Sequence, residues 1–238
     1  MEYNIGCSGW FYWHWKGLFY PEELPQSKWF NYYTEKFDTV ELNSPFYHWP
    51  KISTAKSWYR KSPKNFVYTL KVNRFITHIK KFKNCKKLID SFYKIGEELK
   101  EKMGCFLFQL PPSLHFSKRK LEEIIRQLNS EKTNVIEFRH KSWFIPEVYE
   151  KLKTNGIIFC IVSAPELPED FVKTADDVYI RFHGKTNWYA DNYSDEELRE
   201  WAKKIKKSKA KRVWVYFNND TNAYAPWNAL KLRKILAG

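Results

Sequence analysis

Cys105-Phe-Leu-Phe-Gln-Leu110 is a short apolar run, and a similar run, Val135-Ile-Glu-Phe-Arg139, follows it further along the chain. Several of the strand-like runs in this chain, the first of these included, are apolar nearly throughout, which is typical of a parallel strand covered on both faces. Between them, one face of a helical pattern collects Leu121, Ile124, Ile125 and Leu128. The stretch therefore predicts a strand, a helix and a second strand parallel to the first.

This unit recurs along the chain. Eight runs have the strand pattern: Tyr3–Ser8, Thr39–Asn43, Phe66–Val72, Cys105–Leu110, Val135–Arg139, Ile157–Val162, Val178–His183 and Val213–Phe217. Helical patterns lie between most of them, including Cys85–Leu99, a helix with Ser194 and Glu197 at capping-box spacing, and Trp227–Leu236 at the end. Strand–helix alternation predicts a parallel sheet. Eight units in 238 residues predict an α/β fold, a single-domain (β/α)8 barrel of the TIM type over residues 1–238.

Two connections differ from the rest. The interval between Val162 and Val178 has room only for a brief helix, so the sixth crossover is predicted to be short and irregular. Asn73–Lys83 is a long connection after the third run and a candidate functional loop. No glycine-rich phosphate loop follows the first run, which argues against a Rossmann or P-loop fold.

The chain is strongly basic, with 41 Lys+Arg against 27 Asp+Glu and a net charge of +14. Such a charge attracts polyanions, including nucleic acid. Lysine-rich surfaces are also typical of proteins from hot environments, so both interpretations stay open. Of two lysine runs, Lys80–Lys87 is the better candidate for a nucleic-acid contact, and Lys203–Arg212 is interpreted as a solvated face.

The sequence predicts a cytoplasmic protein without a membrane partner. It opens with no signal-peptide pattern, and no apolar run approaches the ~20 residues that cross a bilayer. None of the four cysteines forms a CxxC pair, which excludes a zinc ribbon or a CxxC redox motif. Reduced cysteines are expected, and a disulfide is left open. Nothing in the sequence indicates a protein partner.

Short motifs at the strand ends resemble those of a known family. They are Gly6-Cys-Ser-Gly-Trp10, Trp15, Gly17, Phe19-Tyr-Pro21, Val40-Glu-Leu-Asn-Ser-Pro-Phe-Tyr47, Lys71, Thr77-His78, Phe108-Gln-Leu-Pro-Pro112, Glu137-Phe-Arg-His-Lys-Ser-Trp143, Arg181-Phe-His-Gly184, Tyr216-Phe-Asn-Asn-Asp220 and Asn228-Ala229. On these motifs the chain resembles the YecE-like family, also called domain of unknown function 72, nearly from end to end. The resemblance implies a TIM-type barrel and no established reaction. The family pattern has a small residue where Cys7 stands, so it implies no special role for this thiol.

The C-terminal ends of barrel strands converge on one mouth, and this sequence places polar residues there repeatedly. Alternate side chains of a strand lie on the same face. Glu41 therefore shares a face with Asn43, Glu137 with Arg139, and Arg181 with His183. The predicted catalytic residues are Glu41 or Glu137 as general base and His183 as acid or base. The predicted substrate-binding residues are Ser8, Trp10, Asn43, Tyr47, Lys71, His78, Gln109, Arg139, His140, Arg181, Asn218, Asn219 and Asp220.

A structural alternative exists for the same residues, because buried charges are costly unless they are paired. In it, the mouth holds a lattice of ion pairs, such as Glu41 with Lys71 or Glu137 with Arg181. The aromatic first loop, Trp10–Trp15, is likewise open between stacking on a ligand and roofing the barrel.

No organic cofactor motif is present, and the cofactor is left unknown. HExxH, HxH and DxD patterns are absent, so no metal ligand is predicted. A divalent metal on Glu41, Glu137, His183 and Asp220 is left open but not favoured, because Lys and Arg residues surround these positions.

The leading functional hypothesis is an enzyme acting on an anionic, phosphate-containing substrate at the C-terminal mouth. Its most concrete form is hydrolase-like cleavage of a phosphodiester in nucleic acid, because arginine fits phosphate and aromatic rings stack on bases. The alternatives are a sugar or sugar-phosphate isomerase or hydrolase, and a barrel that binds nucleic acid or a metabolite without catalysis.

Overall fold

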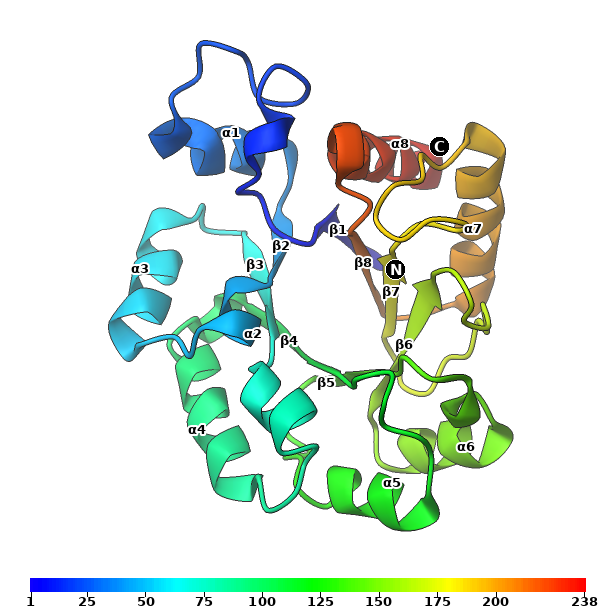
Figure 1. The fold of residues 1–238 in the computed structure, drawn as a ribbon. Helices are drawn as coiled ribbons and strands as arrows, with labels where there is room; N and C mark the ends of the chain where they lie inside the picture. The colour runs from blue at the N-terminus through cyan, green and yellow to red at the C-terminus, as the bar shows by residue number, and fades with distance from the viewer.

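Eight parallel strands close into a barrel in the computed structural model, which describes residues 1–238 (Figure 1). The strands are β1 (Glu2–Cys7), β2 (Thr39–Leu42), β3 (Val67–Lys71), β4 (Met103–Gln109), β5 (Asn134–Glu137), β6 (Ile158–Ser163), β7 (Val178–Phe182) and β8 (Arg212–Phe217). Each strand pairs with the next one along the chain, and β8 pairs with β1. The predicted TIM-type barrel is therefore confirmed.

Helices surround the barrel (Figure 1). They are α1 (Trp29–Lys36), α2 (Ser44–Tyr47), α3 (Ile52–Lys61), α4 (Lys86–Glu97), α5 (Lys118–Ile125), α6 (Pro146–Thr154), α7 (Asp195–Ser208) and α8 (Tyr224–Ala237). The predicted capping box begins α7, since the Glu197 amide donates to Ser194 Oγ at 3.2 Å and the Ser194 amide donates to Glu197 Oε2 at 2.9 Å. None of these helices is long and apolar enough to cross a membrane.

Two connections depart from the regular strand–helix–strand pattern, and the irregular sixth crossover is one that the sequence predicts. No helix forms between β6 and β7, so the sixth crossover is irregular over its whole length. The connection after β3 contains a π-helical turn, η3 (Phe75–Ile79), which directs His78 toward the barrel mouth.

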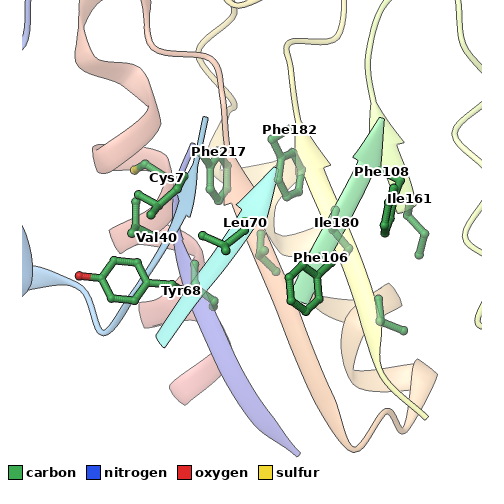
Figure 2. Close-up of a cluster of buried hydrophobic side chains, with 14 of the residues drawn as sticks. Cys7, Val40, Tyr68, Leu70, Phe106, Phe108, Ile161, Ile180, Phe182 and Phe217 are labelled. Carbon is green, nitrogen blue, oxygen red and sulfur yellow. The ribbon is translucent and has the colours of Figure 1, made fainter. Parts of the chain in front are cut away.

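Apolar residues form two separate clusters. The larger has 53 buried residues and packs the outer face of the barrel against the helices, as Phe106, Phe108 and Ile180 illustrate in Figure 2. The smaller has nine and contains the alternate residues of the same strands, such as Cys105 and Leu107. All four cysteines are buried and free, so the disulfide left open by the sequence does not form. The small inner cluster leaves the upper barrel to polar side chains.

Candidate functional site

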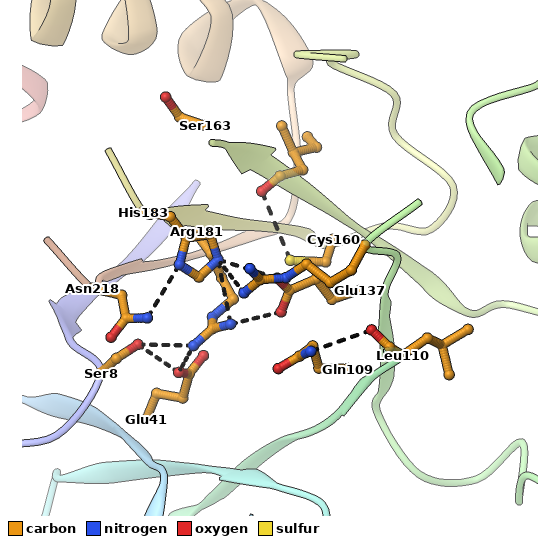
Figure 3. Close-up of polar contacts among 12 residues, drawn as sticks. Ser8, Glu41, Gln109, Leu110, Glu137, Cys160, Ser163, Arg181, His183 and Asn218 are labelled. Atoms are coloured by element: carbon orange, nitrogen blue, oxygen red, sulfur yellow. Dashed lines mark hydrogen bonds and ion pairs between the residues drawn. The ribbon is translucent and has the colours of Figure 1, made fainter. Parts of the chain in front are cut away.

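Arg181 occupies the centre of the polar layer at the barrel mouth (Figure 3). Its Nη1 donates to Glu137 Oε2 at 2.6 Å, and its Nη2 donates to Glu41 Oε1 at 2.6 Å. Both carboxylates and the guanidinium are fully buried. The predicted pair between Glu137 and Arg181 is confirmed, and this one arginine bridges carboxylates from two different strands.

The predicted pair between Glu41 and Lys71 is wrong. Glu41 instead accepts hydrogen bonds from Arg181, from the Ser8 hydroxyl and from the Tyr179 hydroxyl, the last at 2.6 Å. The planar guanidinium reaches two carboxylates at once, which a lysine ammonium does not match in geometry. Glu41 is thus completely enclosed by donors.

Arg139 extends the network toward the surface. Its Nε donates to Glu137 Oε1, and its Nη2 lies 3.0 Å from His183 Nε2. Burial alone would raise the pKa of Glu137, but Arg139 and Arg181 hold it well below its ordinary value. Glu137 therefore remains ionised, and its oxygens are occupied by arginine.

His183 is fully buried among the same charges. Burial and the two arginines hold its pKa well below the ordinary value, so the ring is neutral. One ring nitrogen, Nε2, lies 3.1 Å from Glu137 Oε1, and the other, Nδ1, lies 3.1 Å from Asn218 Nδ2. The Nε2 of a neutral ring either donates to Glu137 or accepts from Arg139, so His183 fixes one of these two side chains at a time.

Lys71, the last residue of β3, differs from every charge above. Its side chain is buried, with 8% of its surface exposed, and it makes no hydrogen bond or ion pair within the chain, although its Nζ is not sealed from solvent. Its Nζ lies 4.1 Å from the centroid of the Phe46 ring. Burial, assisted by Arg181, lowers the pKa of Lys71 to about 7, although Glu137 and Glu41 oppose this. Near neutral pH a large share of this amine is uncharged.

His78 and Gln109 lie beside Lys71. The His78 ring packs edge-on against Phe46 with 5.0 Å between centroids, and its Nε2 is 3.5 Å from Gln109 Nε2. Burial, Lys71 and Arg74 lower the pKa of His78 to about 4, so this ring is neutral too. This side of the mouth therefore holds an amine, an imidazole and an amide.

A cleft of about 670 Å³ opens above the β4–β7 side of the mouth. Its lining residues are Gln109, Pro112, Arg139, His140, Lys141, Pro165, Glu166, Leu167, Trp188 and Tyr189. The Arg139 guanidinium lies 4.7 Å from the centroid of a Trp188 ring. Three of the residues predicted to bind substrate, Gln109, Arg139 and His140, thus face one space.

Gly184 and the Asp191 carboxylate fix the conformation of the loop that carries Trp188 and Tyr189. Gly184 has φ +108°, and a Cβ there would lie 2.1 Å from the Asn187 carbonyl oxygen, so only glycine fits. Asp191 accepts hydrogen bonds from the backbone amides of Lys185, Thr186 and Asn187. These amide bonds, despite some burial, lower the pKa of Asp191 to about 2. The aromatic wall of the cleft is therefore preorganised.

Several predicted residues do not line the cleft. Asn219 is fully buried and holds the Asp191 carbonyl and Asn228, and Asp220 pairs with His14 at 3.1 Å. Tyr47 is exposed on α2, and Trp10 packs against Phe30 with 4.7 Å between ring centroids. These side chains build or surround the mouth and do not enter the cleft.

Ser8 and Asn43 belong to the floor of the mouth. Ser8 Oγ accepts from Arg181 Nη2 at 3.2 Å, and Asn43 Nδ2 donates to the Ser8 carbonyl oxygen at 3.1 Å. The Oδ1 of Asn43 is buried without a partner. No three His, Cys, Asp or Glu side chains gather into a potential metal site, and Asp220 lies with His14 apart from the other three residues considered for a metal.

Sequence reasoning missed Tyr179, Trp188 and Lys141. Tyr179 points inward two residues before Arg181, so the two-residue period of β7 could have found it. Trp188 lies in a loop without periodicity, and only its place after a strand end signals it. Lys141 follows His140 at the mouth end of β5.

Comparison with known proteins gives one consistent result. A family model described as "Protein of unknown function DUF72" matches residues 4–238. The UPF0759 protein YunF of Bacillus subtilis (strain 168) is 25% identical, with 98% of this chain and 94% of that protein covered.

Two solved structures are also similar. The crystal structure of a DUF72 family protein of Thermotoga maritima (TM1631) has a TM-score of 0.91 and 31% identity, with both chains covered completely. A DUF72 family protein of Enterococcus faecalis V583 (EF0366) has a TM-score of 0.85 and 22% identity, over 99% of this chain and 96% of that one.

Proposed function

The chain belongs to the DUF72 family of proteins of unknown function, and from the barrel mouth we propose that it acts on a phosphate-containing substrate by cleaving a phosphodiester. One observation carries the proposal. Arg139 uses Nε and Nη2 within the network, but its Nη1 has no partner in the chain and is not sealed from solvent. This free donor group belongs to a cationic side chain that lines the cleft.

The surroundings of Arg139 suit a phosphate ester. Arginine and lysine groups stabilise the charge on a phosphoryl group in the transition state. Lys141 lines the same cleft as Arg139, and Lys71 lies at the neighbouring side of the mouth. The half-buried Trp188 and the exposed Tyr189 line the cleft and offer ring surface for stacking with a base.

The network beneath supports this arrangement. Glu137 fixes Arg139 through Nε, and Arg181 in turn fixes Glu137. Because both carboxylates are enclosed by donors, we assign them to positioning, and we assign proton transfer to Lys71, whose pKa of about 7 suits a general base. This assignment replaces the general-base role that the sequence suggests for Glu41 and Glu137.

Binding and cleavage of labelled oligonucleotides test the proposal. Single- and double-stranded DNA and RNA would be incubated with the wild type, Arg139→Met and Lys207→Met, with and without Mg²⁺. Both variants lose one positive charge, but Lys207 is exposed in the last turn of α7, at the end of the barrel away from the mouth.

We expect salt-sensitive binding and cleavage that Arg139→Met reduces and Lys207→Met retains. For a single strand, Arg139→Met should lower the slope of log affinity against log salt by about 0.7, the value for one phosphate contact. Equal loss in both variants would reduce the effect to overall charge. Binding of none of the nucleic acids at moderate salt would contradict nucleic acid as the substrate.

The volume of the cleft favours a second candidate. About 670 Å³ falls within the range of small-molecule sites, roughly 300–1,000 Å³. A sugar phosphate would place its phosphate at Arg139 and its sugar against Trp188. Such a substrate would bind with little dependence on salt, unlike a polyanion.

A further inference from the structure

We propose that Lys71 is a reactive amine that forms an imine with the carbonyl group of a small phosphorylated substrate held at the barrel mouth. The inference rests on the proposed binding of phosphate at Arg139 but not on phosphodiester cleavage. It names phosphorylated aldehydes and ketones as the substrate class of the second candidate function, in which the cleft holds a sugar phosphate.

Lys71 lacks the carboxylate or hydrogen-bond acceptor that a structural lysine would contact. A lysine with a structural role would neutralise a carboxylate or donate to carbonyl groups. Here both nearby carboxylates are bound by Arg181, and no acceptor in the chain takes a hydrogen bond from Lys71 Nζ. The Phe46 ring at 4.1 Å attracts the charged form of Lys71 but offers its Nζ no lone pair.

The surroundings of the Lys71 amine favour its uncharged form. The charged groups that act on the amine are Glu41 on β2, Glu137 and Arg139 at β5, and Arg181 on β7, and Arg74 acts on the neighbouring His78 after β3. Since the arginines already neutralise the carboxylates, burial dominates and favours the uncharged amine. Desolvated lysines of this kind are the nucleophiles of carbonyl chemistry.

Lys71 also lies on the side of the mouth toward which the proposed substrate extends. In the sheet, Lys71 pairs with Leu107, and Gln109 lies two residues further along β4 with its side chain in the cleft. The same cleft contains Arg139. A substrate whose phosphate contacts Arg139 and whose other end extends past Gln109 is thereby directed toward β3.

The proposed step balances without an oxidant or reductant. The neutral Lys71 nitrogen attacks the carbonyl carbon, a C–N bond forms, the C–O π bond breaks, and one nitrogen proton moves to the carbonyl oxygen to give a carbinolamine. The hydroxyl group then leaves with the second nitrogen proton as water, and a C=N bond remains. One water is released for each imine formed, and added water reverses the reaction.

Reductive trapping tests the inference on the full chain. The protein would be incubated near pH 7 with glycolaldehyde phosphate or with glycolaldehyde, two probes that differ only in the phosphate. Cyanoborohydride would reduce any imine to a stable amine, and peptide mass spectrometry would locate it. Arg139→Met and Lys207→Met would be treated in parallel, and Lys71→Met would be checked for folding by its thermal transition.

We expect the phosphorylated probe to label Lys71 at least about tenfold faster than the exposed Lys207, because far more of the Lys71 amine is neutral at this pH. The labelling rate should rise with pH around a midpoint near 7, which a merely structural lysine would not show. Inorganic phosphate should slow the reaction. Arg139→Met should slow labelling by the phosphorylated probe more than labelling by glycolaldehyde.

The outcomes separate the two proposals. Labelling of Lys71 no faster than of Lys207 would overturn the imine, whatever the phosphate effect. If inorganic phosphate slows labelling but Lys71 is labelled no faster than Lys207, the imine is overturned and the proposed phosphate site remains. Preferential labelling of Lys71 at equal rates by both probes would support the imine and contradict phosphate binding at Arg139. The mapping uses wild-type protein, so a poorly folding Lys71→Met would not affect the decision.

Discussion

The β5–β7 side of the barrel mouth and its β3 side each bury a cation, but only the first side pairs it. Arg181 on β7 has two carboxylates at 2.6 Å and no exposed surface. Lys71 on β3 is nearly as buried and has no polar partner. A buried cation with its counter-ions serves to fix geometry, whereas one without them has a shifted pKa and remains free to react. The same polar layer thus contains a rigid part and a reactive part.

Replacing Arg181 should break the rigid side and produce the largest effect. Arg181→Met leaves Glu41 and Glu137 buried beside an apolar side chain, although Arg139 still contacts Glu137. We expect a loss of about 3–5 kcal/mol in the free energy of unfolding, as for other broken buried ion pairs. Urea denaturation measures it. The control is Lys204→Met, which removes an exposed pair with Glu169 and should cost less than about 1 kcal/mol. A loss for Arg181→Met as small as the control's would show that the network does not hold the mouth.

A second buried lysine sharpens the comparison. Lys102 lies before β4, at the opposite end of the barrel, and donates at 2.9 Å to the Tyr59 and Ser62 carbonyl oxygens and to Ser62 Oγ. Lys102→Met should lower the free energy of unfolding by about 1–3 kcal/mol, because these acceptors lose their donor. A neutral result in urea denaturation would mean that the hydrogen bonds of a buried lysine are no guide to its structural role.

Replacing Lys71 should have the smallest effect on stability at neutral pH. Lys71→Met removes a desolvated amine that has no partner to leave behind, so we expect stability equal to or above that of the wild type at pH 7. Destabilisation comparable to that of Lys102→Met would indicate a partner for Lys71 in solution.

The pH dependence of stability in the wild type and in Lys71→Met shows in which direction the pKa of Lys71 is shifted. The pKa of Lys71 is lowered from 10.5 to about 7 in the folded chain. Between these values the unfolded chain binds more protons, so the stability of the wild type should rise with pH relative to Lys71→Met. The slope should approach, at most, about 1.4 kcal/mol per pH unit. Parallel stability curves across this window would contradict a lowered pKa.

Much of this molecule follows from the sequence, because strand and helix periods are local properties. The barrel, the capping box at Ser194 and the inward pairs such as Glu137 with Arg139 all derive from spacing along one element. Pairing across the barrel does not, since Arg181 could reach Glu41 only once the strands were closed in register. The pair between Glu41 and Lys71 that the sequence suggests does not form, because the closed barrel brings Arg181 to Glu41. The sequence therefore could not show that Lys71 has no partner in the chain.

Loops set the other limit. Trp188 reaches Arg139 because Gly184 and Asp191 shape the segment after β7, and no periodic pattern encodes that shape. Asn219 and Asp220 stand at a strand end, as a substrate ligand would, but their side chains anchor neighbouring loops. Position at a strand end therefore predicts proximity to the mouth, and only the hydrogen bonds decide which side chains face the cleft.

The most direct test of the account is the titration of the Lys71 amine itself. Lysine labelled with ¹³C at Cε would be incorporated into the full chain, and its NMR signals followed with pH, with Lys71→Met assigning the signal of interest. The account predicts that one lysine signal titrates with a midpoint near 7, and that this signal is absent from Lys71→Met. A Lys71 signal that titrates together with the exposed lysines near their ordinary pKa, about 10.4, would contradict the unpaired reactive amine.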